Sequence, residues 1–311
     1  NAKSGMSGSV AHRNETIVLL SQAQDVIKSL NSDDKVRAYI TETLELNAKA
    51  KELNEQDIKD GKLPDIMHEK TKSLLEFKEQ HVKLPRLETP VEEWTDKQLL
   101  DNYKMDLRIA TSEITLWRGI TQLQNASPLK GAYNLRKAWK GFQSLLKELE
   151  SEAEKHNKGQ ANAILYHKDV HEMVLVGVGI FYYLLSVLPA TITKVLEFIG
   201  FKSEREVGIE YLEHVACERG PRSITAILML SINYLFIPSA LEDKTVALSQ
   251  FKPHMDYAVQ VYPQGGMMMF LANQYARKTG DYPKGIEHLQ EAIDSMKKYD
   301  FAPTMYICEL A

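Results

Sequence analysis

Apolar positions follow helical spacing along most of this chain, and the longest apolar run lies between Met173 and Leu188. Only two glycines and a serine interrupt its large apolar side chains. A helix that is apolar all round must be buried in protein or in lipid. Up to Pro189 the run reaches roughly 25 Å at ~1.5 Å per residue, short of the ~30 Å hydrocarbon core of a bilayer. Because Lys194 and Glu197 follow soon after, we interpret the run as a central core helix and not as a membrane span.

The pattern divides the chain into four segments. Residues 1–13 begin with a Gly/Ser-rich stretch and are expected to be a flexible tail or a cloning remnant. Apolar residues at helical spacing predict an N-terminal helical hairpin over 14–53. Residues 54–96 are polar and punctuated by Gly and Pro, which indicates a linker with one helix near 65–81. Helical patterns then follow one another over 97–311.

Two long amphipathic helices open this last segment. Thr95 is the predicted N-cap of the first, and Ser127-Pro128 opens the second. Each helix carries an apolar stripe that must be buried against a neighbour. We therefore expect the large aromatic residues at stripe positions to lie in the core: Tyr103, Trp117, Tyr133, Trp139 and Phe142.

An eight-residue pattern recurs at a constant interval. It begins at Gly131, Gly208 and Gly285, with 77 residues between successive starts, and a weaker copy begins at Ala247. The small first residue lets a neighbouring helix approach, and a large residue four positions later fills the space beside it. A period of about 34 to 40 residues made of paired helices is typical of tetratricopeptide-like arrays. We predict an all-α fold, a right-handed α-α superhelix of such helix pairs.

The central run also resembles a known family signature. Gly-Val-Gly-Ile-Phe at 177–181, Leu-Leu-Ser-Val-Leu-Pro at 184–189 and Leu-Glu-Phe-Ile-Gly-Phe at 196–201 closely resemble the signature of the tetratricopeptide repeat protein 39 family. That family includes the fungal inclusion-body-clearance proteins. The resemblance extends from about Met105 to the C-terminus. It departs from the family pattern at Tyr182, where the usual residue is Asn.

This resemblance implies a non-enzymatic scaffold linked to lipid homeostasis and protein-aggregate clearance. It also implies a cytoplasmic protein that is peripheral to the mitochondrial outer membrane or to lipid droplets.

Composition and charge narrow the class of partner. The 311 residues are 44% hydrophobic and 26% charged, with a net charge of −4, which is ordinary for a globular protein. An acidic balance argues against a dedicated binder of nucleic acid or anionic membrane. The two cysteines, Cys217 and Cys308, are far apart and form no CxxC motif, which indicates a reducing cytoplasm.

Catalytic and metal signals are weak. His167 and His171 stand four residues apart near Asp169 and Glu172, a geometry that can contribute to a zinc or copper site. A closed site needs three or four ligands, so we interpret the pair as solvated histidines on a polar helix face. The sequence contains no HExxH, Walker A or G-x-S-x-G motif. We expect no enzyme, no catalytic residues, no metal and no cofactor.

The leading hypothesis is an adaptor whose concave face binds partner proteins or peptides. In the clearest repeat, we expect the groove to be lined on the helix face away from Ala272 and Ala276. The alternative for this face is ordinary solvated surface. The predicted groove residues are Phe270, Gln274, Arg277 and Lys278.

The competing hypothesis is a lipid carrier, or a protein associated with lipid droplets or membranes, that uses the apolar 173–201 unit. A tunnel of a few hundred Å³ along Gly177 and Gly179 favours this carrier, whereas a closed core favours the adaptor.

The last predicted element, 301–311, has the pattern of the first helix of another pair, so the solenoid is expected to be truncated there. An uncovered terminal pair exposes a stacking surface, and we therefore expect self-association of this chain.

Overall fold

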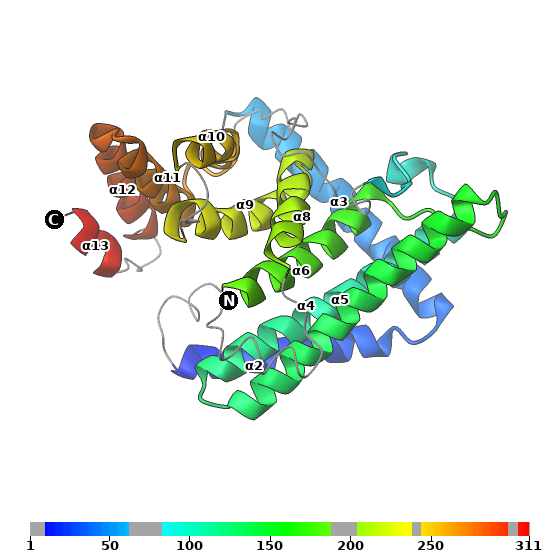
Figure 1. The fold of residues 1–311 in the computed structure, drawn as a ribbon. Coiled ribbons are helices and arrows are strands. Elements are labelled where there is room, and N and C mark those ends of the chain that lie inside the picture. Colours follow the sequence, from blue (N-terminus) through cyan, green and yellow to red (C-terminus); the bar gives the residue numbers. More distant parts are fainter. Residues whose placement is uncertain (1–9, 62–82, 188–203, 238–243, 298–303, 311) are drawn as a thin grey trace. The chain divides into compact units, whose positions relative to one another are not determined.

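The computed structural model describes residues 10–61, 83–187, 204–237, 244–297 and 304–310 (Figure 1). The described residues up to Tyr211 form one compact unit, and those from Leu212 onward form a second. The division falls inside helix α8 (Arg205–Glu218). Among the described residues the elements are helices, apart from one isolated parallel bridge between Leu87 and His167, which confirms the all-α prediction.

The first unit is built on two long antiparallel helices, α4 (Asp96–Gln124) and α5 (Pro128–Asn157), which lie side by side (Figure 1). The start of α4 is a capping box, in which Thr95 and Gln98 each satisfy the other's backbone N–H. Pro128 opens α5, where its missing N–H leaves no bond unmade. Both starts agree with the sequence prediction.

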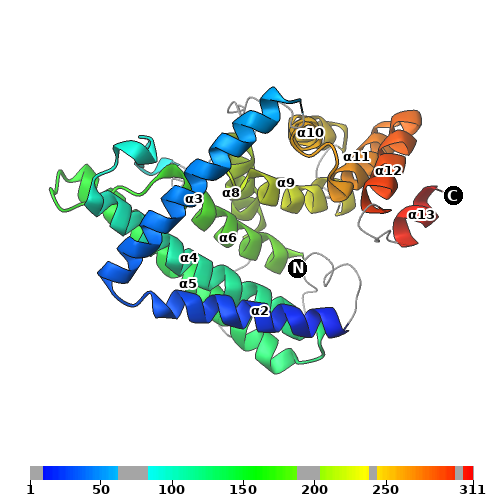
Figure 2. The ribbon, with the colours of Figure 1, turned by 180° about the vertical axis from the view of Figure 1, so that it is seen from behind.

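Two further helices, α2 (Val10–Ser29) and α3 (Asp33–Lys59), pack against α4 (Figure 2). The first turn of α2 falls in the predicted tail, and α3 continues beyond residue 53. The predicted helix near 65–81 lies outside the described residues. Arg118 of α4 donates a hydrogen bond to Gln24 of α2 at 2.8 Å. A small apolar cluster fixes α3 to α4: Val36, Ile40 and Leu100, with Leu44, Leu99, Tyr103 and Leu107 around them.

Helix α6 (Lys168–Ser186) is the predicted core helix. Buried side chains surround it on nearly every face between Val170 and Leu185. By length and composition α6 could cross a membrane, but 67% of its most apolar window is buried within the protein. The remainder of the apolar unit, residues 188–203, lies outside the described part of the chain.

Glycine allows α6 and α5 to approach closely. A Cβ atom built on Gly177 would lie 2.1 Å from Cε1 of Phe142, so the Phe142 ring occupies the space that any larger residue would need. Phe142 itself is 1% exposed, and Trp139 of the same helix is equally buried. The core of the first unit therefore lies along the contact between α5 and α6.

Two aromatic residues do not lie where the apolar pattern predicts. Trp117 is 56% exposed and Tyr133 is 69% exposed, whereas the core prediction holds for Trp139 and Phe142. Periodicity identifies the apolar stripe of a helix but not how much of it a neighbour covers. Trp117 and Tyr133 occupy parts of α4 and α5 that no described element fully covers.

The second unit begins in α8 and continues through α9 (Ser223–Ser231), the π-helical turn η3 (Ile232–Phe236) and α10 (Lys244–Val261). It ends with α11 (Gly266–Thr279), α12 (Tyr282–Lys297) and α13 (Thr304–Leu310). Helices α11 and α12 form a closely packed pair (Figure 1). Gly280 caps α11 with φ of 85°, a left-handed conformation that glycine adopts without strain, and this is the predicted Gly280-Asp281 turn.

The glycines that begin the repeated pattern have different surroundings. A Cβ atom on Gly208 would lie 2.8 Å from the backbone nitrogen of Tyr183 and 3.0 Å from the carbonyl oxygen of Gly179. On Gly285 the nearest neighbour would be Asn273 Nδ2 at 3.4 Å, an ordinary contact. The predicted close approach is therefore strict at Gly208 and relaxed at Gly285.

This difference gives a paired stability test. We expect Gly208→Ala to lower the free energy of unfolding by about 1 to 3 kcal/mol, because the methyl group meets backbone that cannot move aside. Gly285→Ala should be neutral or raise it by up to about 1 kcal/mol, because alanine favours a helix interior. Urea denaturation of both variants measures this. Equal losses at the two sites would contradict the packing described.

Candidate functional site

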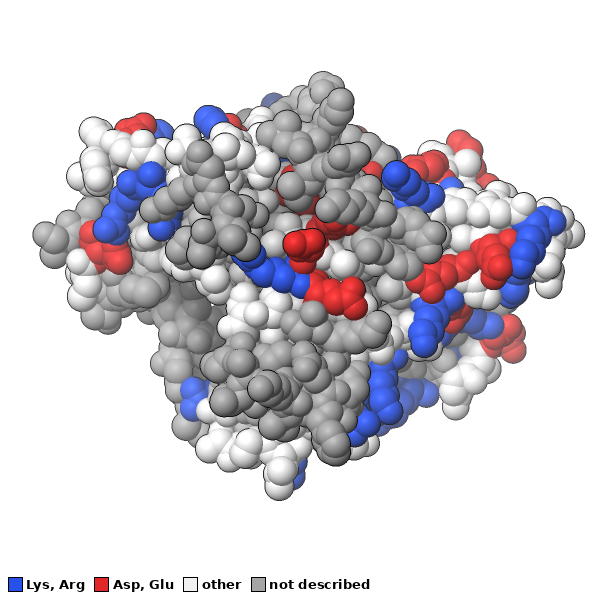
Figure 3. Space-filling view, in the orientation of Figure 1, with Lys and Arg blue, Asp and Glu red and all other residues white. Residues whose placement is uncertain are grey.

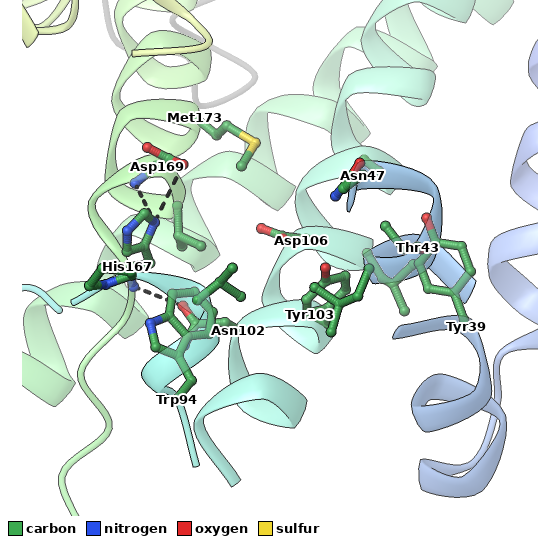
Figure 4. Close-up of a pocket in the computed structure, with 16 residues that line it drawn as sticks. Tyr39, Thr43, Asn47, Trp94, Asn102, Tyr103, Asp106, His167, Asp169 and Met173 are labelled. Atoms are coloured by element: carbon green, nitrogen blue, oxygen red, sulfur yellow. Dashed lines mark hydrogen bonds and ion pairs between the residues drawn. The ribbon is translucent and has the colours of Figure 1, made fainter. Parts of the chain in front are cut away.

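A hollow of about 510 Å³ opens in the first unit between α3, α4, the start of α6 and the 3-10 turn η2 (Val91–Glu93) (Figure 4). Each helix lines it with side chains four residues apart, the spacing of a single helix face. These residues are Tyr39, Thr43 and Asn47 from α3, Asn102, Asp106 and Ala110 from α4, and Asp169 and Met173 from α6.

Asn102 fixes the position of α6 relative to α4. Its side-chain oxygen accepts the backbone N–H of His167 at 2.8 Å, and its amide nitrogen donates to the carbonyl oxygen of Gln98 at 2.9 Å. The residue is 1% exposed. Sequence analysis missed it, although a signal was present: Asn102 lies three residues from both Leu99 and Met105, within an apolar stripe.

The segment before α4 is tied to the same point. Leu87 donates its backbone N–H to Tyr166 at 2.8 Å and accepts the N–H of Lys168 at 3.2 Å. This holds the chain that leads through η2 to Trp94 against the first turn of α6. The indole N–H of Trp94 bonds the carbonyl oxygen of Thr89 at 2.9 Å, which fixes the ring as a wall of the hollow.

Aromatic rings form much of the lining. The rings of Trp94 and His167 have centroids 5.0 Å apart, and those of Tyr39 and Tyr103 meet edge to face at 6.5 Å. Burial raises the pKa of Tyr103 above its usual value, and the nearby Asp106 and Tyr39 raise it further. The phenol of Tyr103 is therefore neutral at physiological pH.

The charge at the hollow is negative. In Figure 4, Asp106 stands between side chains of α6 on one side and side chains of α3 on the other. A second carboxylate, that of Asp169, lies 3.4 Å from Nδ1 of His167. The same Nδ1 accepts the backbone N–H of Asp169 at 3.4 Å, so His167 is the N-cap of α6. None of the residues that line the hollow is lysine or arginine.

The interpretation of His167 and His171 as solvated is wrong. His171 is 4% exposed and lies in the core of the first unit, and His167 lines the hollow. The α6 face that carries them is covered by other parts of the unit, which the local sequence does not reveal.

The predicted groove residues lie on α11 in the second unit. Phe270 is 7% exposed and stacks on Tyr306 of α13 with 4.4 Å between ring centroids. Arg277 forms an ion pair with Glu309 of the same helix. Gln274 donates to Asn273 at 3.1 Å, and Lys278 is half-buried. Helix α13 therefore covers part of this face, and partner binding by these residues stays a prediction.

A hollow of about 470 Å³ in the second unit lies on another side of α11. Its floor includes Ala272 and Ala276, and its rim includes Lys252 and Lys284. Lys252 is paired with Asp256 at 2.5 Å. This hollow lies on the side of α11 that the sequence assigned to the buried core.

The second unit also buries a polar network between α8 and α10. His254 Nε2 lies 3.0 Å from Glu213 Oε1, and His254 Nδ1 lies 3.3 Å from Arg219 Nη1. The Arg219 guanidinium also donates to the carbonyl oxygen of Pro253 at 3.2 Å and lies 4.1 Å from the centre of the Tyr257 ring. Burial lowers the pKa of Arg219 from its usual value, but arginine remains charged.

Three members of this neighbourhood, Glu213, Cys217 and His254, have ligand atoms within 4.8 Å of one another and resemble a metal-binding set. Arg219 disfavours a cation there. Guanidinium only donates hydrogen bonds, so His254 Nδ1 must accept, and its proton sits on Nε2, directed at Glu213. A metal at Nε2 would have to displace that proton beside a fixed positive charge.

The repeated pattern marks this network in the sequence. The eighth position is occupied by Ala138, Val215 and Ala292 in three copies and by His254 in the copy that begins at Ala247. All four side chains are buried, at 2% exposure or less. Sequence analysis did not notice the departure, yet a histidine in a small apolar position was a readable sign of a buried polar contact.

Comparison with known proteins agrees with this class of helical protein. The described part of the chain consists of helices, with packed helix pairs and a recurring eight-residue pattern. A sequence profile of the family described as Iml2/Tetratricopeptide repeat protein 39 matches residues 44–310. The chain therefore belongs to this family, which confirms the resemblance seen in the sequence.

Two relatives are similar over part of their length. Tetratricopeptide repeat protein ttc-39B of Caenorhabditis elegans is 27% identical over 178 residues, which cover 56% of this chain and 30% of the relative. An uncharacterized protein of Schizosaccharomyces pombe is 21% identical over 220 residues, covering 64% of this chain and 37% of the relative. The chain thus spans about a third of these relatives. No solved structure matches it.

Removing the Asn102 side chain tests how the hollow is held together. We expect Asn102→Ala to cost about 1 to 3 kcal/mol, because the buried N–H of His167 loses its acceptor. The control is Asn47→Ala, which alters an exposed residue of the lining and should stay within about 0.5 kcal/mol of wild type. Urea denaturation distinguishes the two, and equal effects would argue against a positioning role for Asn102.

Restoring the repeat pattern at His254 should destabilise the protein. His254→Val removes one partner of a buried charged network, and we expect a loss of about 3 to 5 kcal/mol. The double variant His254→Val with Arg219→Met should lose less than the sum of the single changes, because the buried cation is removed as well. Thermal and urea unfolding measure both quantities. Stabilisation by His254→Val alone would show that the network contributes nothing.

Proposed function

We propose that this chain is a non-enzymatic helical-repeat scaffold that binds partner proteins, with its helix pairs forming part of a right-handed superhelix. The hollow between α3, α4 and α6 is proposed as a docking site. The observation that carries this is the lining: three helices converge on one open recess with side chains in register. A recess of this size suits one or two side chains of a partner segment.

The chemistry of the hollow favours binding over catalysis. Its lining includes no serine, cysteine or lysine that could act as a nucleophile. His167 uses Nδ1 to cap α6 and is held in that role by the hydrogen bond from Asn102 to its backbone. A general base needs a nucleophile or bound water within reach, and the lining supplies no such pairing of side chains.

Surface charge favours a protein partner. On the face that Figure 3 shows, basic and acidic side chains of the described residues are interspersed without a broad basic field. With a net charge of −4, this surface does not attract a polyanion.

The lipid-carrier alternative required a tunnel along Gly177 and Gly179. The Phe142 ring occupies the space beside Gly177, and Gly208 packs against the carbonyl oxygen of Gly179. This close packing supports the scaffold. The groove on α11 remains a second proposed contact surface through Gln274 and Lys278.

A peptide library tests the docking site directly. Random twelve-residue peptides displayed on phage are selected on the purified chain, and the enriched sequences are synthesised. Ala110→Trp fills the hollow and should weaken their binding at least tenfold, which corresponds to about 1.4 kcal/mol. Lys140→Trp places the same side chain on an exposed position of α5 and should leave binding unchanged. Melting temperatures confirm that both variants fold.

Two results would contradict the proposal. Peptides that bind all three proteins equally would place the contact elsewhere, and a library without enrichment would argue against peptide binding by this chain.

A further inference from the structure

The hollow of the first unit has a charge and a shape that select a particular kind of side chain. We propose that it receives an arginine side chain presented by a partner protein, with the guanidinium between the carboxylates of Asp106 and Asp169 and against the aromatic walls. This rests on the proposed docking function and specifies its partner.

The two carboxylates come from different helices. Asp106 stands on α4 and Asp169 in the first turn of α6, and both line the same recess. In Figure 4 their side chains lie on either side of an open space, with Met173 above it. A cation entering this space faces two negative groups, whereas an anionic side chain would face the same two groups with only His167 to balance them.

The basic residues near the hollow are already engaged outside it. Lys104 of α4 pairs with Asp33 at 2.7 Å, and Arg108 pairs with Glu148 at 2.6 Å. Arg37 of α3 forms an ion pair with Asp96. These cations are therefore held by other carboxylates, and none of them lines the recess.

The aromatic walls favour arginine over lysine. Tyr39, Tyr103 and Trp94 present ring surfaces on which a planar guanidinium can stack. Guanidinium is also more weakly hydrated than ammonium, so less hydration is lost when it leaves water. Asn47 and Thr43 at the rim supply oxygen atoms that can accept its remaining N–H groups.

A series of short peptides tests the inference. The probes are acetyl-Gly-Gly-X-Gly-Gly-amide peptides in which X is arginine, citrulline, lysine or glutamate. Citrulline has the shape of arginine without its charge. Binding is followed by shifts of backbone and Trp94 indole resonances in two-dimensional NMR spectra of the whole chain, at low salt because exposed ion pairs are screened.

We expect the arginine peptide to bind with a Kd on the order of 1 mM, at least tenfold tighter than the citrulline peptide. Lysine should fall between them, and glutamate should cause no shift at the hollow. In the double variant Asp106→Asn with Asp169→Asn, the preference for arginine over citrulline should fall to about twofold or less. Asp101→Asn, a charge change on α4 outside the lining, should retain the full preference.

The outcomes separate this inference from the docking proposal. If arginine and citrulline peptides bind equally and both lose binding in Ala110→Trp, the hollow is a docking site without charge selection, and the arginine inference is overturned. If no probe shifts the lining resonances while selected phage peptides still bind there, the inference also falls and docking stands. If the arginine preference persists in the double variant, the carboxylates are not its cause.

Discussion

The close contact between α5 and α6 supports the rest of the first unit. Helix α6 is apolar on nearly every face, and such a helix is stable only when surrounded. Gly177 makes this possible because it leaves room for the ring of Phe142, which fills the space a side chain would take. Once α6 is held in this way, its first turn has a fixed position. His167 and Asp169 are then presented to α4, and the hollow follows from that placement.

Buried polar residues determine how the apolar helices are joined. Packing alone allows helices to slide or rotate with little cost, whereas a buried hydrogen bond is satisfied in one arrangement only. Asn102 has this role between α4 and α6, and the network of Glu213, His254 and Arg219 has it between α8 and α10. Arg219 also has φ of 56°, a conformation more usual for glycine, and its side chain reaches α10 from there.

The two hollows show how a repeat architecture can vary its surfaces without changing its core. The first is lined by carboxylates and aromatic rings, and the second by small residues with lysines at the rim. In both, the lining residues project from helices whose opposite faces are packed. The identity of a lining residue can therefore change at little cost in stability, and surfaces of this kind are suited to diverse partners.

The sequence by itself determined the helical class, the core role of the Met173–Leu188 run and the family. These depend on local periodicity and on short signatures, which do not require knowledge of the partner element. Tertiary structure decided which parts of each apolar stripe are covered: Trp117 and Tyr133 are exposed, and Phe270 lies under Tyr306. The hollow joins residues from Tyr39 to Met173, far apart in sequence. Helical spacing says which residues share a face, but only packing says which faces meet.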